Sequence, residues 1–336
     1  MKTACFYQSA ADGSVSCGLC AHQCTIKPGR RGICGVRENR GGELYSLVYG
    51  QVAAEHIDPV EKKPLFHFLP GSLTYSVATV GCNFRCLHCQ NYTLSQLSGS
   101  VDDLPHRYRE PAAIVDQAVA TGCRSISYTY SEPTVFFEFA YDCCRAARQK
   151  GLHNIFVSNG YMSRPAAQLL AEVLGAINID IKSFSDDFYR TICGGRLQPV
   201  LDNVRFFREQ GVWVEATTLI IPGLNDTDAE LRSIAEFLVS CDPNIPWHVS
   251  GFHPTFKMLD RPSTSAQRLL TARDLGLAAG LNYVYVGNIR GSGGEATLCP
   301  ACSRVLVERS GFLVNANHLI DGRCPQCQQP VAGIWN

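Results

Sequence analysis

The sequence predicts an α/β protein in which an open partial (β/α)6 barrel carries a small cysteine-rich metal module at each end. Two observations predict the barrel. Short apolar runs alternate with helix-type segments between about residues 72 and 288, and such repeats form parallel sheets with right-handed crossovers. Six or seven units are too few for a closed barrel of eight. The third observation is that two clusters of cysteines lie outside this core, one toward each end of the chain.

We therefore expect three segments. An N-terminal cysteine-rich module covers residues 1–70, the partial barrel covers 71–292, and a C-terminal module of the zinc-ribbon or rubredoxin type covers 293–336. A short sheet is expected within the first segment, over Glu43–Ala54.

Seven segments of the barrel are expected to be strands, because they are apolar runs rich in Val, Ile, Thr and Tyr. They are Leu73–Val80, Ser125–Tyr130, Asn154–Ser158, Ala176–Ile181, Val212–Ile221, Trp247–Phe252 and Tyr283–Val286. The helices between them carry start and stop signals, namely a proline or a Ser/Thr cap, and a following glycine. They are expected over Pro111–Thr121, Arg164–Leu174, Thr227–Ser240 and Leu269–Ala279.

The composition indicates a folded protein and bears on its partners and its compartment. The chain is 46% hydrophobic and 18% charged, which supports a sizeable core and argues against disorder. Lys plus Arg equals Asp plus Glu, so no nucleic-acid or membrane partner is expected. We find no export signal and no long apolar run, and we expect a cytoplasmic protein. In that compartment, 17 cysteines indicate metal sites rather than disulfides.

The central cysteines Cys82, Cys86 and Cys89 have the spacing C-x3-C-x2-C and follow directly after the first predicted strand. Three thiolates can bind three irons of a [4Fe–4S] cluster and leave the fourth iron open. A chelating ligand such as the amino acid moiety of S-adenosylmethionine (SAM) can bind there. The loops at these strand ends build the active sites of β/α barrels. The alternatives are a zinc site that borrows His88, or three unrelated cysteines.

The triplet resembles the cluster motif of the radical SAM superfamily, in which an aromatic residue usually precedes the third cysteine, as His88 does here. The resemblance makes His88 a candidate for cofactor binding. The run GCNFRCLHCQN (81–91), the lead-in DPVEKKPL (58–65) and both cysteine-rich ends are similar to the AmmeMemoRadiSam-system radical SAM enzymes. Those enzymes are related to the pyruvate formate-lyase activating enzymes.

This resemblance implies a radical SAM barrel and reductive cleavage of SAM to a 5′-deoxyadenosyl radical. The radical would abstract hydrogen from a substrate, either a small molecule or a protein. The resemblance also implies an electron donor such as flavodoxin or ferredoxin. The alternative within the same family is an activating enzyme that acts on a partner glycyl-radical enzyme.

The resemblance implies several SAM contacts at strand ends. The superfamily's Gly-Gly-Glu motif corresponds to Tyr130-Ser131-Glu132, where Glu132 keeps the carboxylate and Ser131 replaces a glycine. The alternative is that Ser131 caps a helix beginning at Pro133. In the activating enzymes an Asp-x-Lys pair contacts SAM, and this role falls to Asp180 and Lys182. For these two, a salt bridge inside the barrel is the alternative.

Three further polar residues are candidates for cofactor binding because they lie in predicted barrel strands or at their ends. Asn159 follows the third strand, where a simple turn is the alternative. Glu215 lies within the fifth strand and would contact the cofactor or satisfy the barrel interior. His253 closes the sixth strand and would contact SAM or substrate, or be structural.

Two terminal cysteine sets predict further metal sites. The C-terminal set has the spacing C-x2-C-x21-C-x2-C, which gives a tetrahedral S4 site for Zn²⁺, or alternatively for a rubredoxin-like iron. It consists of Cys299, Cys302, Cys324 and Cys327. The N-terminal set, C-x2-C-x3-C-x9-C, would hold Zn²⁺ or an auxiliary iron–sulfur cluster. It consists of Cys17, Cys20, Cys24 and Cys34. The remaining cysteines, Cys193 among them, are expected to be buried small residues or idle thiols.

Overall fold

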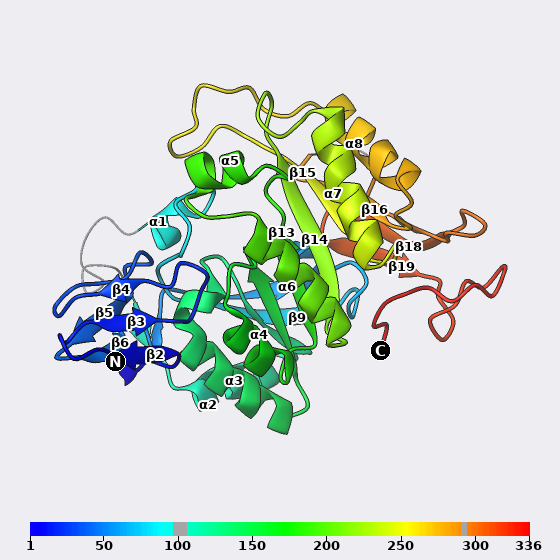
Figure 1. The fold of residues 1–336 in the computed structure, drawn as a ribbon. Coiled ribbons are helices and arrows are strands. Elements are labelled where there is room, and N and C mark those ends of the chain that lie inside the picture. Colours follow the sequence, from blue (N-terminus) through cyan, green and yellow to red (C-terminus); the bar gives the residue numbers. More distant parts are fainter. Residues whose placement is uncertain (97–105, 290–293) are drawn as a thin grey trace.

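A computed structural model gives the structure of the chain and describes residues 1–96, 106–289 and 294–336 (Figure 1). Its centre is an eight-stranded sheet. The strands are β8 (Ala54–Pro59), β9 (Leu73–Ala78), β11 (Ser125–Tyr128), β12 (His153–Ser158), β13 (Ala176–Asp180), β14 (Trp213–Ile220), β15 (Trp247–Gly251) and β16 (Val284–Gly287). Their order is β16-β15-β14-β13-β12-β11-β9-β8.

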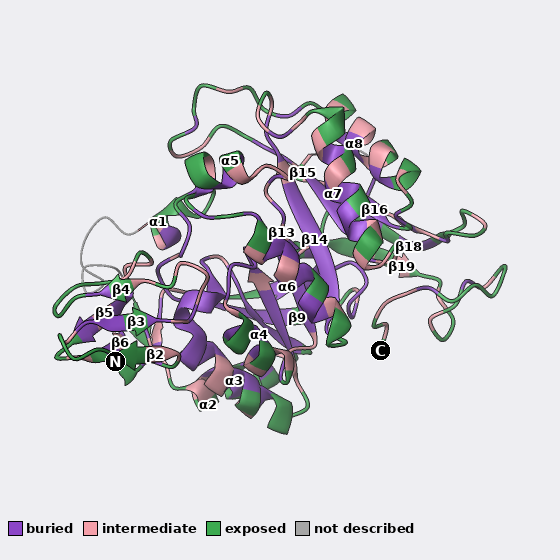
Figure 2. Ribbon diagram, in the orientation of Figure 1, coloured by how far each residue is buried: buried purple, intermediate pink, exposed green. Residues whose placement is uncertain are grey.

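The strands from β9 to β16 are parallel neighbours, and β8 runs antiparallel along β9. All seven expected barrel strands are confirmed, so the parallel part has one strand more than a (β/α)6 barrel. No hydrogen-bonded pair among the described strands joins β16 to β8, and the sheet is open there. β11 is buried at every residue, as a strand covered on both faces should be. Figure 2 shows the central strands buried beneath partly exposed helices.

The main helices pack against the sheet and against one another (Figure 1). They are α2 (Pro111–Ala120), α3 (Phe137–Gln149), α4 (Arg164–Ala171), α6 (Gln198–Glu209), α7 (Asp228–Cys241) and α8 (Ala266–Ala278). Shorter helical segments are η1 (Val60–Lys62), α1 (Tyr92–Ser95), η3 (Pro133–Phe136), α5 (Asp186–Phe188) and the π-helical η4 (Tyr189–Cys193). None of the described helices is long and apolar enough to cross a membrane.

Two of the predicted helices begin at the caps that were expected for them. Ser163 caps α4 and Thr227 caps α7, each accepting a backbone N–H, as expected. No helix was predicted over α3 or α6. Neither helix has a side-chain cap, since Phe136 and Leu197 occupy their N-cap positions, although the proline in the first turn of α6 was an available start signal.

The N-terminal segment forms small antiparallel sheets beside the barrel (Figure 1). Their strands are β1 (Lys2–Thr3), β2 (Tyr7–Ser9), β3 (Val15–Cys17), β4 (Thr25–Ile26), β5 (Arg37–Arg40), β6 (Glu43–Ser46) and β7 (Gln51–Val52), with β10 (Arg107–Tyr108) paired to β7. A buried ion pair at 2.6 Å joins Arg37 of β5 to Glu138 of α3. The main sheet begins before residue 71, because β8 pairs along the whole of β9.

The C-terminal segment is a three-stranded sheet of β17 (Thr297–Leu298), β18 (Val305–Ser310) and β19 (Leu313–Asn317). Leu306 and Val331 pack on Phe66, Tyr283 and Tyr285 of the main body. The segment is therefore attached through its own small apolar core. The predicted boundary at residues 292/293 lies outside the described residues.

Candidate functional site

The carboxyl ends of the parallel strands surround a cavity of about 410 Å³. Cys82, Cys86 and Cys89 all line it. Six of the residues predicted to bind the cofactor also line it. They are His88, Ser131, Glu132, Asn159, Asp180 and Lys182. Residues at the ends of β11, β12 and β13 thus share one space with the three thiols.

Gly81 allows the chain to leave β9 and enter the cysteine loop. Its φ of +104° is a conformation that favours glycine. A Cβ atom here would lie 2.6 Å from Cγ1 of Val36. Beyond it, the backbone N–H of Phe84 donates to Sγ of Cys82 at 3.3 Å, so the loop itself supplies a donor to the first sulfur.

The electrostatics of the cavity involve the cysteines and Lys182. Burial raises the pKa of Cys82 well above its usual range, so a thiolate there requires a bound cation. A hydrogen bond with Cys193 lowers the pKa of Cys86. Burial alone would lower the pKa of Lys182, but Asp180 and Cys86 outweigh it and raise that pKa well above its usual range. Lys182 therefore stays charged beside the sulfurs.

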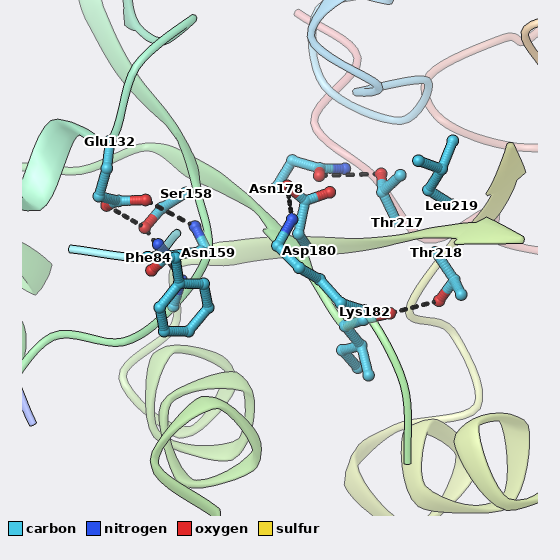
Figure 3. A network of polar contacts seen from close by, with 12 residues as sticks. Phe84, Glu132, Ser158, Asn159, Asn178, Asp180, Lys182, Thr217, Thr218 and Leu219 are labelled. Atoms are coloured by element: carbon cyan, nitrogen blue, oxygen red, sulfur yellow. Dashed lines mark hydrogen bonds and ion pairs between the residues drawn. The ribbon is translucent and has the colours of Figure 1, made fainter. Parts of the chain in front are cut away.

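Glu132 uses both of its carboxylate oxygens inside the protein (Figure 3). Oε1 accepts from the N–H and the hydroxyl of Thr134 at 3.0 and 2.6 Å, and from Ser158 Oγ at 2.7 Å. Oε2 accepts the backbone N–H of Asn159 at 2.8 Å. Glu132 is 3% exposed, and burial raises its pKa. The carboxylate holds the ends of β11 and β12 together.

The alternative role considered for Ser131, that of a helix cap, is not found in the structure. The N-cap of η3 is Glu132, which accepts from the N–H of Thr134, and Pro133 is the first residue of the helix. Ser131 Oγ instead donates to the carbonyl of Thr79 at 2.6 Å. The longer Glu132 side chain reaches the free N–H groups because its own backbone is extended.

Asp180 and Lys182 form an ion pair on the cavity wall, with Oδ2 and Nζ 3.1 Å apart. Figure 3 shows both at the end of β13. The Asp180 side chain is 36% exposed and that of Lys182 17% exposed. The salt bridge predicted as the alternative is therefore present, and both residues also line the cavity.

Two predicted cofactor residues lie outside the cavity. Glu215 accepts the backbone N–H groups of Phe66 and His67 at 3.0 and 2.8 Å and pairs with His248 at 2.6 Å. Its hydrogen bonds are made inside the barrel, because Glu215 lies near the start of β14 rather than at its end. His253 is exposed and reaches Ser263 Oγ at 3.1 Å. The cofactor role expected for each is not supported by its position.

Two residues beside the central cysteines were not predicted to belong to the site. Cys193, expected to be a buried small residue or an idle thiol, is buried, and it lies close enough to Cys86 to lower the pKa of that thiol. Lys63 lines the cavity, is 1% exposed and pairs with Asp58 at 2.7 Å. Burial lowers the pKa of Lys63 to about 8. The available signal for Lys63 was the lead-in DPVEKKPL, which contains both members of this pair.

The structure also brings together each terminal cysteine set. Among the described residues, one group of three or more candidate ligands has all donor atoms within 4.8 Å of one another, and it is the C-terminal set. Its sulfur pairs Cys299–Cys327 and Cys302–Cys324 are 3.5 and 3.7 Å apart, which suits one tetrahedral ion. The N-terminal cysteines line a separate hollow of about 20 Å³.

Comparisons with known proteins agree with this geometry. Residues 76–238 match the radical SAM superfamily. An uncharacterized protein of Methanocaldococcus jannaschii is 43% identical over 98% of this chain and 97% of its own length. The pyruvate formate-lyase 1-activating enzyme of Escherichia coli K12 is 23% identical over 52% of this chain and 73% of its own. A radical SAM methyltransferase from Sphaerobacter thermophilus has the same fold, with a TM-score of 0.52 at 17% identity, covering 67% of this chain and 69% of that one.

Proposed function

The chain belongs to the radical SAM superfamily, and from this we propose that Cys82, Cys86 and Cys89 hold a [4Fe–4S] cluster whose open iron binds SAM. One observation carries the proposal: the three thiols share a single cavity with Glu132, Asp180 and Lys182 at the strand ends. When bound, these groups supply reductive cleavage of SAM and a 5′-deoxyadenosyl radical that abstracts hydrogen from the substrate.

The residues present fit such a cluster and ligand. Three thiols line the cavity, and Cys193, which contacts Cys86, is not among its lining residues. Three protein ligands leave one iron open. Nδ1 of His88 is buried and has no hydrogen-bond partner within the described part of the chain. Burial lowers the pKa of His88 to about 3, so the ring stays neutral beside the sulfurs.

The ion pair on the cavity wall supports recognition of the amino acid end of SAM. The carboxylate of Asp180 can accept from an ammonium group, and the Nζ of Lys182 can donate to a carboxylate. Both groups are partly exposed and 3.1 Å apart. A zwitterionic ligand can therefore contact both at once. We assign direct SAM contacts to Asp180 and Lys182.

Glu132 is better described as a positioning residue. Its oxygens already accept four hydrogen bonds from the protein. Asn159, which it holds, donates through Nδ2 to Oδ1 of Asn83 at 2.7 Å and lies 3.8 Å from Sγ of Cys82. Glu132 thus fixes a donor next to the first cluster ligand, and Ser131 lines the cavity beside it.

A second candidate function is activation of a glycyl-radical enzyme. It is favoured by the similarity to the activating enzyme of Escherichia coli, which spans 52% of this chain. Mixing the reduced protein and SAM with a candidate glycyl-radical enzyme distinguishes the two functions. A glycyl doublet in the electron paramagnetic resonance spectrum supports activation, and its absence with a range of such enzymes favours a different substrate. The AmmeMemoRadiSam assignment rests on the sequence resemblance.

The binding of SAM at the cluster has a spectroscopic test. The protein is reconstituted anaerobically, reduced with dithionite and examined by electron paramagnetic resonance with and without SAM. We expect SAM to change the spectrum of the reduced cluster, and we expect a smaller change in Lys182→Ala. A cluster spectrum that SAM leaves unaltered would contradict binding at the open iron.

A further inference from the structure

We propose that Cys17, Cys20, Cys24 and Cys34 hold a second iron–sulfur cluster and that this cluster passes electrons to the central one. The metal assignment goes beyond the proposed function and does not depend on it. The electron transfer rests on the central cluster being present. Three observations carry the proposal, namely the spacing of the sulfurs, the lining of the hollow and its contact with the central loop.

The distances between sulfur atoms differ among the three cysteine sets of this chain. A single zinc ion binds thiolates at about 2.3 Å, so any two of its sulfur ligands lie within about 4.6 Å. In the described part of the chain, the four C-terminal sulfurs lie within 4.8 Å of one another, close to this limit, whereas no three of the N-terminal sulfurs lie that close together. The three sulfurs of the central triplet do not lie that close together either. The N-terminal set therefore lacks the close sulfur spacing of a single-zinc site.

A cluster of four irons and four sulfides requires wider spacing because these atoms lie between the cysteine sulfurs. All four N-terminal cysteines nevertheless line one hollow, so they enclose a common space. The remaining lining is largely apolar and includes Leu19, Ile26, Ile33 and Val135. An apolar surrounding that excludes water suits a cluster and influences its reduction potential.

The hollow lies against the loop that carries the central cysteines. Nε2 of His22, which lines the hollow, is 2.7 Å from the carbonyl oxygen of Asn83. Asn83 follows Cys82 directly in the chain. The carbonyl oxygen of Cys34 lies 3.2 Å from the position of a Cβ on Gly81. Ligands of both sites are thus joined through adjacent backbone.

This contact gives the second cluster a role. A reduced one-electron donor of the flavodoxin or ferredoxin class loses one electron, and the N-terminal cluster gains it. The same electron then passes to the central cluster, and the N-terminal cluster returns to its oxidised state. No bond forms or breaks at the cysteines. Cys20, Cys24 and Cys34 are only partly buried, so a docked donor can approach this side.

The metal assignment is tested with the full-length chain carrying Cys82→Ala, Cys86→Ala and Cys89→Ala. After anaerobic reconstitution, this variant should retain about four irons and four sulfides per chain, with a cluster signal in electron paramagnetic resonance after reduction. Adding Cys20→Ser and Cys24→Ser should remove both, whereas adding Cys241→Ser, outside every cysteine set, should not. If the first variant binds no sulfide and its N-terminal site holds one zinc ion, the proposal is overturned. This count decides the question even if the second variant does not fold.

The electron transfer is tested without SAM, so that failure of SAM cleavage cannot be mistaken for failure of the relay. In Cys20→Ser/Cys24→Ser with an otherwise intact chain, dithionite should still reduce the central cluster. Reduced flavodoxin, followed by stopped-flow absorbance, should do so at least ten-fold more slowly than in the wild type. An equal rate in both proteins would exclude the relay.

Discussion

The backbone N–H of Asn159 donates to Oε2 of Glu132 at 2.8 Å and joins the end of β12 to the residue that caps η3. The side chain of Asn159 continues the contact to Asn83, beside Cys82. The resemblance to the superfamily implies that the carboxylate of Glu132 contacts SAM. In this structure, both of its oxygens instead accept hydrogen bonds from the protein. Its influence on the cluster passes through Asn159.

The first prediction concerns the stability contributed by Glu132. Glu132→Ala leaves four buried donors without their acceptor, so the free energy of unfolding should fall by about 3 kcal/mol. Ser131→Ala removes a single hydrogen bond, to Thr79, and should lower it by about 1 kcal/mol. Urea unfolding of both variants measures the difference. Equal losses would show that Glu132 does not have this positioning role.

The second prediction concerns affinity for SAM. Lys182→Ala should weaken SAM binding by about ten-fold or more, because a charge-assisted hydrogen bond and the charge beside Cys86 are lost. Asp180→Asn should weaken it by a similar factor. Both variants should keep the iron content of the wild type. His253→Ala, outside the cavity, is the matched control and should bind SAM normally. Isothermal titration calorimetry gives the affinities, and a loss confined to His253→Ala would refute the placement.

The third prediction concerns stability toward acid. Burial lowers the pKa of His67 from 6.5 to about 4, so the folded protein keeps this ring neutral where the unfolded chain binds a proton. Its contribution is complete above pH 6.5 and is lost as the pH falls toward 4, to the extent of about 3 kcal/mol. Unfolding measured at pH 7.5 and pH 4.5 should show a smaller decrease for His67→Asn. The same decrease in both proteins would contradict the assignment to His67.

The fourth prediction concerns the C-terminal metal site. Cys324→Ser should remove one bound ion per chain and loosen β18 and β19, because metal binding and folding are coupled in such modules. Hydrogen exchange of the backbone amides in these strands should accelerate at least ten-fold, and that of β13 should not change. Cys241→Ser is the control. Metal analysis that finds the ion retained in Cys324→Ser would exclude this site.

Local sequence patterns were sufficient for most of the barrel. Each parallel strand was an apolar run between turn residues, and the triplet directly followed the first of these runs. The position of Asp180 and Lys182 followed from their place at the end of a strand. Strand ends of a parallel sheet meet at one edge, so a local reading placed these residues in one cavity.

Contacts distant in sequence could not be predicted in this way. Glu215 was recognised as a charge in an apolar strand, but its partners Phe66 and His67 come from a loop 149 and 148 residues away. Cys193 has no spacing that relates it to Cys86, although η4 brings the two together. Such contacts depend on how the loops cross the barrel ends, which neither periodicity nor capping signals encode.

The central claim is that Cys82, Cys86 and Cys89 support the cleavage of SAM. The most direct measurement is the formation of 5′-deoxyadenosine, detected by mass spectrometry, after anaerobic reconstitution and addition of dithionite and SAM. The wild type should form 5′-deoxyadenosine, and Cys82→Ala, Cys86→Ala and Cys89→Ala should each form none above the level without protein. If all three variants form it at the rate of the wild type, the assignment of the central site is wrong.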